Sequence, residues 1–297
     1  MLNHLNSEDK KPNRVLILGS QGFIGSAIYS RLEKLGVTVL GLGSKDLNLI
    51  SPDATEKLIS LLDAKDVLVF VSAKAPCKDL AMLLENIQMG KSVYDALKAK
   101  PVSHVVYISS DAVYGDSDRP MTEDSSAAPS STHGVMHLAR EIGLQQDYSG
   151  PLAIVRPTLV YGLNDPHNGY GPNRFRRLAA EGKEIVLFGE GEERRDHVDV
   201  EDIAELISMI ILRKSVGTIN AVSGDVVSFK ELACLAASSF ESAVTVKGTS
   251  RSGPMPHNGY RAFDNSAVSK AFPGFQFKSW KEGLTKVNQQ YKAQISK

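Results

Sequence analysis

The chain alternates between short apolar runs and longer segments with the amphipathic spacing of helices. The apolar runs predict strands buried on both faces, because a strand between two helical layers has no polar side. They lie at residues 14–18, 37–40, 67–71, 104–109 and 152–155. The helical segments that follow the first four lie at residues 26–35, 53–62, 79–98 and 133–147. This alternation, without a repeat of fixed period, predicts an α/β fold with a doubly wound parallel sheet.

The pattern changes after about residue 163, where residues 164–173 are rich in turn formers. Short strands are expected at residues 185–188, 218–221 and 243–246, and helices near residues 200–212, 228–240 and 279–293. We therefore predict a larger domain over residues 14–162 and a smaller C-terminal α/β substrate-binding cap over residues 163–297, interleaved with the first. The polar residues 1–13 are predicted to be disordered.

A glycine-rich turn joins the first strand to the first helix. It contains Gly19, Gly22 and Gly25, with Phe23 and Ile24 between the last two. Glycines at this spacing allow a tight turn, close approach of the backbone to phosphate, and close packing of helix on strand. Free N–H groups at a helix N-terminus then hold the pyrophosphate of a dinucleotide. The turn therefore predicts a Rossmann dinucleotide-binding domain.

The residues after the second strand bear on the identity of the dinucleotide. An acidic residue about 20 positions after the glycines would bind the ribose 2′-hydroxyl of NAD, but Gly41 and Gly43 stand there. Ser44 and Lys45 follow, and a hydroxyl with an ammonium group suits a 2′-phosphate. We therefore favour NADP over NAD, with Asp46 better placed for the adenine. The alternative for Lys45 is a solvated loop charge.

The composition excludes several classes of protein. The 297 residues include 34 Lys and Arg and 34 Asp and Glu, so no overall field favours nucleic acid or an anionic membrane. The most apolar long segment, residues 203–212, is too short to span a bilayer. The two cysteines are far apart, and the N-terminus lacks the apolar region of a signal peptide. These features predict a cytoplasmic protein that binds neither nucleic acid nor membrane.

Five ordered blocks resemble the extended short-chain dehydrogenase/reductase family, in its NAD-dependent epimerase/dehydratase branch. They are the glycine turn, residues 109–115 (SSDAVYG), residues 156–162 (RPTLVYG), residues 189–204 and the terminal segment 280–284 (WKEGL). Residues 43–49, which include Leu47, together with Ala73 and Lys74, are similar to the NADP-using GDP-fucose synthase group. The resemblance implies a Rossmann fold, a bound dinucleotide and a nucleotide-sugar substrate.

The chain departs from this family at its catalytic pair. The resemblance implies a Tyr-x-x-x-Lys pair, in which tyrosine exchanges a proton with the sugar hydroxyl and lysine binds the nicotinamide ribose. His133 stands at the tyrosine position and His137 at the lysine position, while Pro129 and Glu141 match the flanking pattern.

Several interpretations of the two histidines remain open. His133 could replace tyrosine as the acid/base, since imidazole titrates near neutrality, with His137 contacting the ribose or tuning His133 from the same helix face. The fold could instead keep its ligands and lose redox chemistry, leaving a binding or regulatory protein. A metal site or plain surface histidines are further alternatives, but no Glu follows His133 as in metalloprotease helices, and we predict no metal.

The resemblance assigns the remaining site residues. Ser110 corresponds to the serine that binds the reacting oxygen, and Asp111 to the acid of dehydratases. Ala112 replaces the glutamate base those enzymes need, which argues against 4,6-dehydratase action. Asn173, with Arg174 beside it, and Arg195 correspond to the substrate-loop asparagine and the pyrophosphate arginine. At position 159, where the family often has asparagine, the chain has leucine.

Together these features predict an NAD(P)-dependent nucleotide-sugar epimerase or 4-keto-sugar reductase. Hydride would pass at sugar C4, with Ser110 and His133 as polar catalysts. The alternative is a catalytically altered member that acts as a binding or regulatory protein. The resemblance also implies a homodimer, formed through a helix pair that includes residues 133–147.

Overall fold

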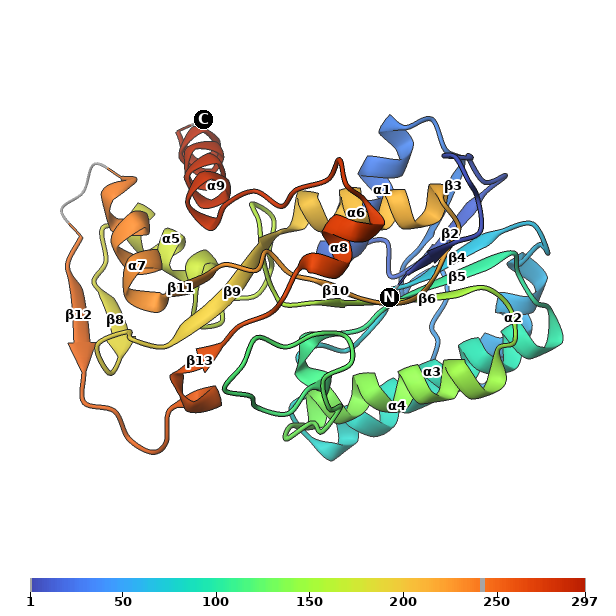
Figure 1. Ribbon diagram of the computed structural model, residues 1–297, viewed down its shortest axis with the longest axis horizontal. Coiled ribbons are helices and arrows are strands. Elements are labelled where there is room, and N and C mark those ends of the chain that lie inside the picture. The colour runs from blue at the N-terminus through green and yellow to red at the C-terminus, as the bar shows by residue number, and fades with distance from the viewer. Residues whose placement is uncertain (1, 241–243, 297) are drawn as a thin grey trace.

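A large sheet covered by helices on both faces lies beside a smaller α/β unit (Figure 1). The computed structural model describes residues 2–240 and 244–296. The strand predicted at residues 243–246 begins at Ala243, outside the described residues, and the strand observed next is β12, Val246–Thr249.

Four of the five predicted apolar strands lie inside a seven-stranded sheet in the order β1-β10-β6-β5-β4-β2-β3. The fifth, predicted at residues 37–40, forms the edge strand β3, which is mostly only partly buried because no strand covers its outer side. Adjacent strands of this sheet are parallel, except that the edge strand β1 is antiparallel to β10. The parallel strands are β2 (Val15–Leu18), β3 (Val39–Leu42), β4 (Val67–Phe70), β5 (His104–Ile108), β6 (Leu152–Pro157) and β10 (Ser215–Ala221). Every residue of β2, β4 and β5 is buried, as expected for strands between two helical layers. The predicted doubly wound α/β architecture is confirmed.

Two helical layers enclose this sheet (Figure 1). One layer contains α1 (Phe23–Lys34) and α6 (Val200–Leu212), and the other contains α2 (Ala54–Leu61), α3 (Leu80–Ala99) and α4 (Thr132–Asp147). Ile28 and Ile207 belong to the apolar core of the first layer, Leu58 and Val93 to that of the second. Among the described residues, no helix combines the length and the apolar character needed to cross a bilayer.

The order of the strands determines where a ligand can bind. From β2 the chain runs to β3 on one side and then crosses to β4 on the other. In open α/β sheets the crevice at such a reversal, beyond the carboxyl ends of the strands, is the usual ligand site. The residues after Leu18 and Phe70 lie at this position.

The smaller unit has its own apolar core around Phe175, Leu232 and Leu284. Its strands are β7 (Leu159–Tyr161), β8 (Ile185–Phe188), β9 (Arg194–Asp199), β11 (Val226–Ser228), β12 and β13 (Tyr260–Arg261), and its helices are α5 (Pro172–Ala180), α7 (Phe229–Ser238) and α9 (Trp280–Ile295). The pattern placed α6 and β10 with this unit, but α6 packs on α1 and β10 pairs with β6. The chain therefore returns to the large sheet before it completes the smaller unit.

The N-terminal segment differs from its predicted disorder. Asn3–His4 form β1, which pairs antiparallel with β10. The His4 ring lies 2.7 Å from the Ser215 hydroxyl and 2.8 Å from the Ala271 carbonyl oxygen. Pairing with β1 satisfies the backbone groups at the edge of β10, a long-range contact that polar composition does not reveal.

Candidate active site

The glycine turn after β2 has the geometry of an open anion cradle. Gly19 has a φ of +95°, which favours glycine, and a Cβ on Gly25 would lie 2.1 Å from the Gly19 carbonyl oxygen. No side chain caps the N-terminus of α1 at Gly22. Within the described part of the chain, the first N–H groups of the helix therefore have no capping side chain and can hold a phosphate.

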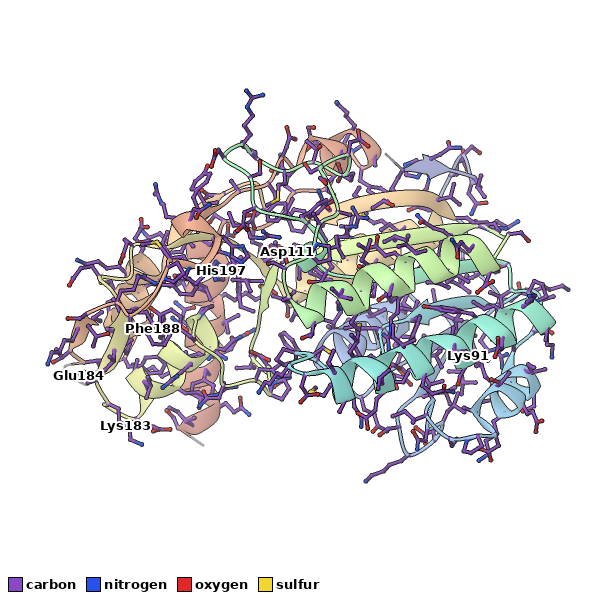
Figure 2. The ribbon with its side chains drawn as sticks, turned by 90° about the horizontal axis from the view of Figure 1, so that it is seen from below. Lys91, Asp111, Lys183, Glu184, Phe188 and His197 are labelled. Atoms are coloured by element: carbon purple, nitrogen blue, oxygen red, sulfur yellow. The ribbon has the colours of Figure 1, made fainter. Side chains whose placement is uncertain are left out.

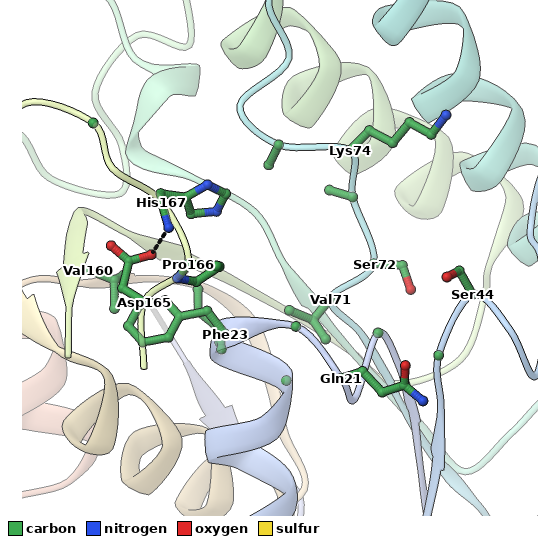
Figure 3. A pocket seen from close by; sticks show the side chains of 18 of the residues that line it. Gln21, Phe23, Ser44, Val71, Ser72, Lys74, Val160, Asp165, Pro166 and His167 are labelled. Atoms are coloured by element: carbon green, nitrogen blue, oxygen red, sulfur yellow. Dashed lines mark hydrogen bonds between the residues drawn. The ribbon is translucent and has the colours of Figure 1, made fainter. Parts of the chain in front are cut away.

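A cavity of about 780 Å³ lies against this turn (Figure 3). It extends over the carboxyl ends of β2, β3 and β4 to residues 165–173 and His197, which belong to the smaller unit. The volume is at the upper end of the range for small-molecule sites. The cavity thus lies at the reversal of strand order and also between the two units.

Many of the predicted site residues line this cavity. They are Gly19, Gly22, Phe23, Ile24, Gly25, Ser44, Leu47, Ala73, Lys74 and Asn173. The others lie outside its lining: Lys45, Asp46, Ser110, Asp111, His133, His137, Arg174 and Arg195. Most residues predicted to bind the dinucleotide thus line one cavity, whereas the residues predicted to be catalytic lie outside its lining.

The turn after β3 contains the residues considered for the 2′-position of the ribose. The Asp46 carboxylate accepts a hydrogen bond from the Gly43 N–H at 2.8 Å, so it holds its own turn closed. Ser44 and Lys45 are exposed, and Ser44 lines the cavity. A hydroxyl and an ammonium group are therefore free at the position where an NAD-binding acid would stand.

The segment after β4 is held in place by α3. Asn86 accepts from the Lys74 N–H at 2.9 Å and donates to the Lys74 carbonyl oxygen at 3.0 Å. The Lys74 ammonium group lies 2.7 Å from Glu85 on α3, and Figure 3 shows this side chain pointing away from the cavity. Lys74 therefore contributes to the cavity wall with its charge already paired.

Arg140 joins α4 to this wall, a role that sequence reasoning missed. The side chain is buried and donates to the carbonyl oxygens of Ser72 and Asn86 at 2.8 and 2.7 Å. Its guanidinium carbon lies 4.9 Å from the centre of the Phe70 ring. No motif marked this arginine, because its partners are backbone oxygens on two other elements.

The two histidines of α4 lie on one helix face, with ring centres 4.8 Å apart and planes perpendicular. His137 is only 5% exposed, and its Nδ1 lies 2.8 Å from the Tyr107 hydroxyl. Burial lowers the pKa of His137 well below its ordinary value, helped by His133 and Arg140. Because His137 is buried and outside the lining, its position suits tuning of His133 better than contact with a ribose.

His133 is only partly buried. Its Nδ1 accepts a hydrogen bond from the Cys77 N–H at 3.4 Å, which leaves the ring proton on Nε2. Burial lowers the pKa of His133, while the Asp111 carboxylate acts in the opposite direction. The ring is therefore neutral near pH 7, where it can donate a hydrogen bond from Nε2 but has no surplus proton to release.

Ser110 and Asp111 follow β5 at the junction of the two units, where Asp111 begins a short 3₁₀ turn capped by Ser110. The Ser110 hydroxyl lies 3.3 Å from one Asp111 oxygen, and the other oxygen accepts from Arg261 Nε at 3.0 Å. Figure 2 shows Asp111 and His197 where the two parts of the molecule meet. Sequence reasoning missed Arg261, 150 positions from Asp111, because no pattern links them. The carboxylate predicted to act as an acid is already engaged by a buried arginine.

The three predicted substrate residues are in different environments. Asn173 lines the cavity, but its oxygen accepts from Arg176 at 3.1 Å and its NH₂ group donates to Asp165. Arg195 lies 3.2 Å from Glu193, and its Nε has no partner among the described residues. Arg174 is exposed on α5. Only Asn173 therefore contacts the cavity, and it does so as part of an internal hydrogen-bond network.

Residues 15–222 match the family model of the NAD-dependent epimerase/dehydratase family. The chain belongs to this family. A UDP-glucose epimerase YtcB of Bacillus subtilis, described as uncharacterized, is 25% identical over 67% of this chain and 72% of its own length. A putative GDP-L-fucose synthase 2 of Oryza sativa subsp. japonica is 26% identical over 75% of this chain and 72% of its own length.

Solved structures share this fold. The UDP-glucose 4-epimerase of Thermus thermophilus, in complex with NAD, superposes with a TM-score of 0.81 at 22% identity, covering 94% of this chain and 99% of that chain. A GDP-L-fucose synthetase of Naegleria fowleri bound to NADP has a TM-score of 0.81 at 16% identity, covering 99% and 98%. At these identities the likeness establishes the fold alone.

For a member of the NAD-dependent epimerase/dehydratase family, the residues at the glycine turn fit a nicotinamide dinucleotide. A Cβ on Gly25 would collide with the Gly19 carbonyl oxygen, and the Gly22 N–H closes the turn by donating to that oxygen at 3.0 Å. The N–H groups that follow at the start of α1, from Phe23 on, suit a pyrophosphate. Within residues 2–240 and 244–296, no three His, Cys, Asp or Glu side chains are grouped as metal ligands. Sequence reasoning also missed His197 and residues 165–167 of the lining, although residues 164–173 had been noted as a turn-rich segment.

Proposed function

We propose that this chain is an NADP-dependent nucleotide-sugar enzyme that epimerises or reduces at sugar C4. The observation that carries the proposal is the single cavity that begins at an open dinucleotide cradle and ends at the smaller unit. Such a cavity can hold a dinucleotide and a second ligand end to end. Relatives named as a UDP-glucose epimerase and a GDP-L-fucose synthase support a nucleotide sugar as that second ligand.

We propose positions for the parts of the dinucleotide from the residues of the cradle. We expect Gly22, Phe23 and Gly25 to surround the pyrophosphate, and Ser44 with Lys45 to bind a 2′-phosphate. NADP is favoured because the Asp46 carboxylate already accepts a hydrogen bond from Gly43 in its own turn, so it is not available to a ribose 2′-hydroxyl. NAD is the alternative. The bound nicotinamide would supply or accept the hydride at C4.

The polar catalysts would act on the oxygen at C4. The Ser110 hydroxyl and His133 Nε2–H would donate hydrogen bonds to a ketone or alkoxide oxygen and stabilise its charge. A neutral His133 can also take a proton from a C4 hydroxyl, if its ring proton moves to Nδ1 and the bond from Cys77 N–H is released. We expect Asn173, Arg174 and Arg195 to contribute to binding the sugar nucleotide, in which case Arg174 must reach the ligand from α5.

Two measurements test this function. Denatured protein is assayed for released cofactor, since a redox-neutral epimerase retains its dinucleotide whereas a reductase consumes added NADPH. Turnover of UDP-glucose, GDP-L-fucose and their 4-keto forms is then followed for the wild type and for His133→Ala. We expect the variant to lose most of its turnover, and unchanged turnover would eliminate His133 as a catalyst.

A binding or regulatory protein is the second candidate, and one observation favours it. The His137 ring at the lysine position is buried and engaged by Tyr107, so no cation is presented there. Under this alternative the wild type binds nucleotide sugar without turnover, and His133→Tyr combined with His137→Lys creates activity that the parent lacks. Activity in the wild type would contradict it.

We also propose a homodimer formed through α3 and α4. Both helices expose large apolar side chains, among them Leu80, Leu84 and Ile87 on α3 and Val135 and Ile142 on α4. Apolar side chains gathered on adjacent helices are typical of a subunit interface. Light scattering of the purified protein measures the assembly directly.

A further inference from the structure

His197 is a lining residue whose chemistry the proposed function leaves unused. It lies on β9 with only 1% of its surface exposed, and it contributes to the cavity wall. Its Nε2 is buried and has no hydrogen-bond partner among the described residues. A buried polar atom without a partner is costly, so a missing ligand group is expected beside it.

The neighbours of the ring determine which hydrogen-bond role Nε2 has. Nδ1 lies 3.1 Å from the Arg195 carbonyl oxygen, which can only accept, so Nδ1 carries the proton. Burial and the charge of Arg195 lower the pKa of His197 to about 3, so the ring stays neutral in the working range. Nε2 therefore has a free lone pair and acts as an acceptor.

The ring is buried and apolar side chains pack against it, which gives this acceptor its importance. Leu159 on β7 is the register partner of His197 and also lines the cavity. The Phe229 ring packs against the imidazole with centres 5.8 Å apart, and Tyr170 stacks on Phe229 at 4.7 Å. A hydrogen bond formed in such a place gains strength from the low local polarity.

We infer that His197 is a positioning residue that accepts a hydrogen bond through Nε2 from a hydroxyl or amide N–H of the bound ligand. Two ligand groups of the proposed function have this chemistry: a sugar hydroxyl and the carboxamide of the nicotinamide. The inference thus rests on the proposed function for the identity of the ligand. A ligand that offers only acceptors at this place would be rejected, because two lone pairs would face each other.

Binding titrations on the full chain test this role. His197→Phe keeps an aromatic ring beside Phe229 but removes the acceptor, and His197→Gln keeps an acceptor. The probes are NADPH, its 3-acetylpyridine analogue, which lacks the amide N–H, and UDP-glucose or GDP-L-fucose in the presence of NADP. We expect His197→Phe to weaken one ligand about three- to tenfold and His197→Gln to restore part of this loss.

The pattern of losses identifies the donor. Weaker binding of the sugar nucleotide alone supports a sugar hydroxyl, and weaker binding of NADPH but not of the acetylpyridine analogue supports the carboxamide. Unchanged affinity for all probes overturns the inference. If the wild type binds no sugar nucleotide, the proposed function fails while the NADPH comparison still tests His197.

A measurement on the wild type covers the case in which His197→Phe does not fold. In protein with ¹⁵N-labelled histidine, the Nε2 resonance of His197 should be that of an unprotonated nitrogen between about pH 5 and about pH 8. It should shift when the ligand is added. A protonated Nε2, or a resonance that no ligand moves, refutes the assignment.

Discussion

Replacing Arg261 by glutamine is predicted to destabilise the protein severely, because it leaves Asp111 as a buried charge without its partner. Arg261 is 2% exposed and Asp111 is 7% exposed. Arg261 Nε donates to the carboxylate at 3.0 Å, and Nη2 donates to the Asp111 carbonyl oxygen at 2.6 Å. Removing one partner of a buried pair typically costs about 3–5 kcal/mol of the free energy of unfolding.

Removing the charge of Asp111 instead of that of Arg261 should cost less of the free energy of unfolding. In Asp111→Asn the Arg261 guanidinium still lies 3.3 Å from the partly exposed Asp116 carboxylate. It also still donates a hydrogen bond to the backbone carbonyl oxygen of residue 111. We expect a loss of about 1–3 kcal/mol. The double variant Asp111→Asn with Arg261→Gln contains no unpaired charge, so it should be more stable than Arg261→Gln alone.

Urea unfolding of the ligand-free protein, followed by circular dichroism near pH 7, measures all four members of this cycle. The predicted coupling energy between the two positions is about 2 kcal/mol or more. If the effects of the two substitutions add to within about 0.5 kcal/mol, the pair is not an ionic clamp and the argument from burial is wrong.

Three further predictions concern the cradle, the core and the interface. Gly25→Ala should lower NADPH affinity roughly tenfold or more, because its Cβ would meet the Gly19 carbonyl oxygen at 2.1 Å. The control Gly274→Ala, whose added Cβ would have nothing within 4 Å, should bind NADPH normally in the same titration. Burial lowers the pKa of His104 from 6.5 to about 4, so the unfolded chain takes up a proton that the folded protein refuses. The contribution of His104 to stability should therefore fall as the pH drops from about 6.5 towards about 4, by roughly 3 kcal/mol in full. In urea unfolding, His104→Gln should make stability depend less on pH, whereas His167→Gln, at an exposed position, should not. Equal slopes of stability against pH in the wild type and in His104→Gln would contradict the assignment. Leu84→Glu, at a side chain 71% exposed, should convert a dimer to monomer in light scattering without unfolding it, and a dimer that persists would place the interface elsewhere.

Features encoded by neighbouring residues could be predicted from the sequence. The apolar runs at β2, β4 and β5 lie in the centre of the sheet because a strand without a polar face needs cover on both sides. The glycine turn could be located because each of its glycines meets a constraint within the turn or at its contact with the end of β4. Residues that are close in the sequence of this turn are also close in space.

Features that depend on distant contacts could not be predicted. β1 was expected to be disordered because its partner strand, β10, is roughly two thirds of the chain away in sequence. The sequence predicted that the smaller unit is interleaved with the larger one, but it could not show which elements return to the large sheet, since only the packing of α6 on α1 and of β10 on β6 reveals this. The motif-based positions of Ser110 and Asp111 gave no sign that a distant arginine engages the carboxylate.

The position of α4 is held by contacts other than those of His133 and His137, which stand where the resemblance implies a catalytic pair. Arg140 holds the helix to the end of β4 and to α3, and Glu141 receives two hydrogen bonds from the buried Arg156. A Cβ on Gly134 would lie 2.0 Å from the Ala112 carbonyl oxygen, so close packing fixes the start of the helix against the end of β5. Substitutions at His133 and His137 can therefore change the chemistry of this helix while its placement is retained. Any activity that His133→Tyr with His137→Lys creates would then report on the groups presented to the ligand, because the surrounding framework is the same in parent and variant.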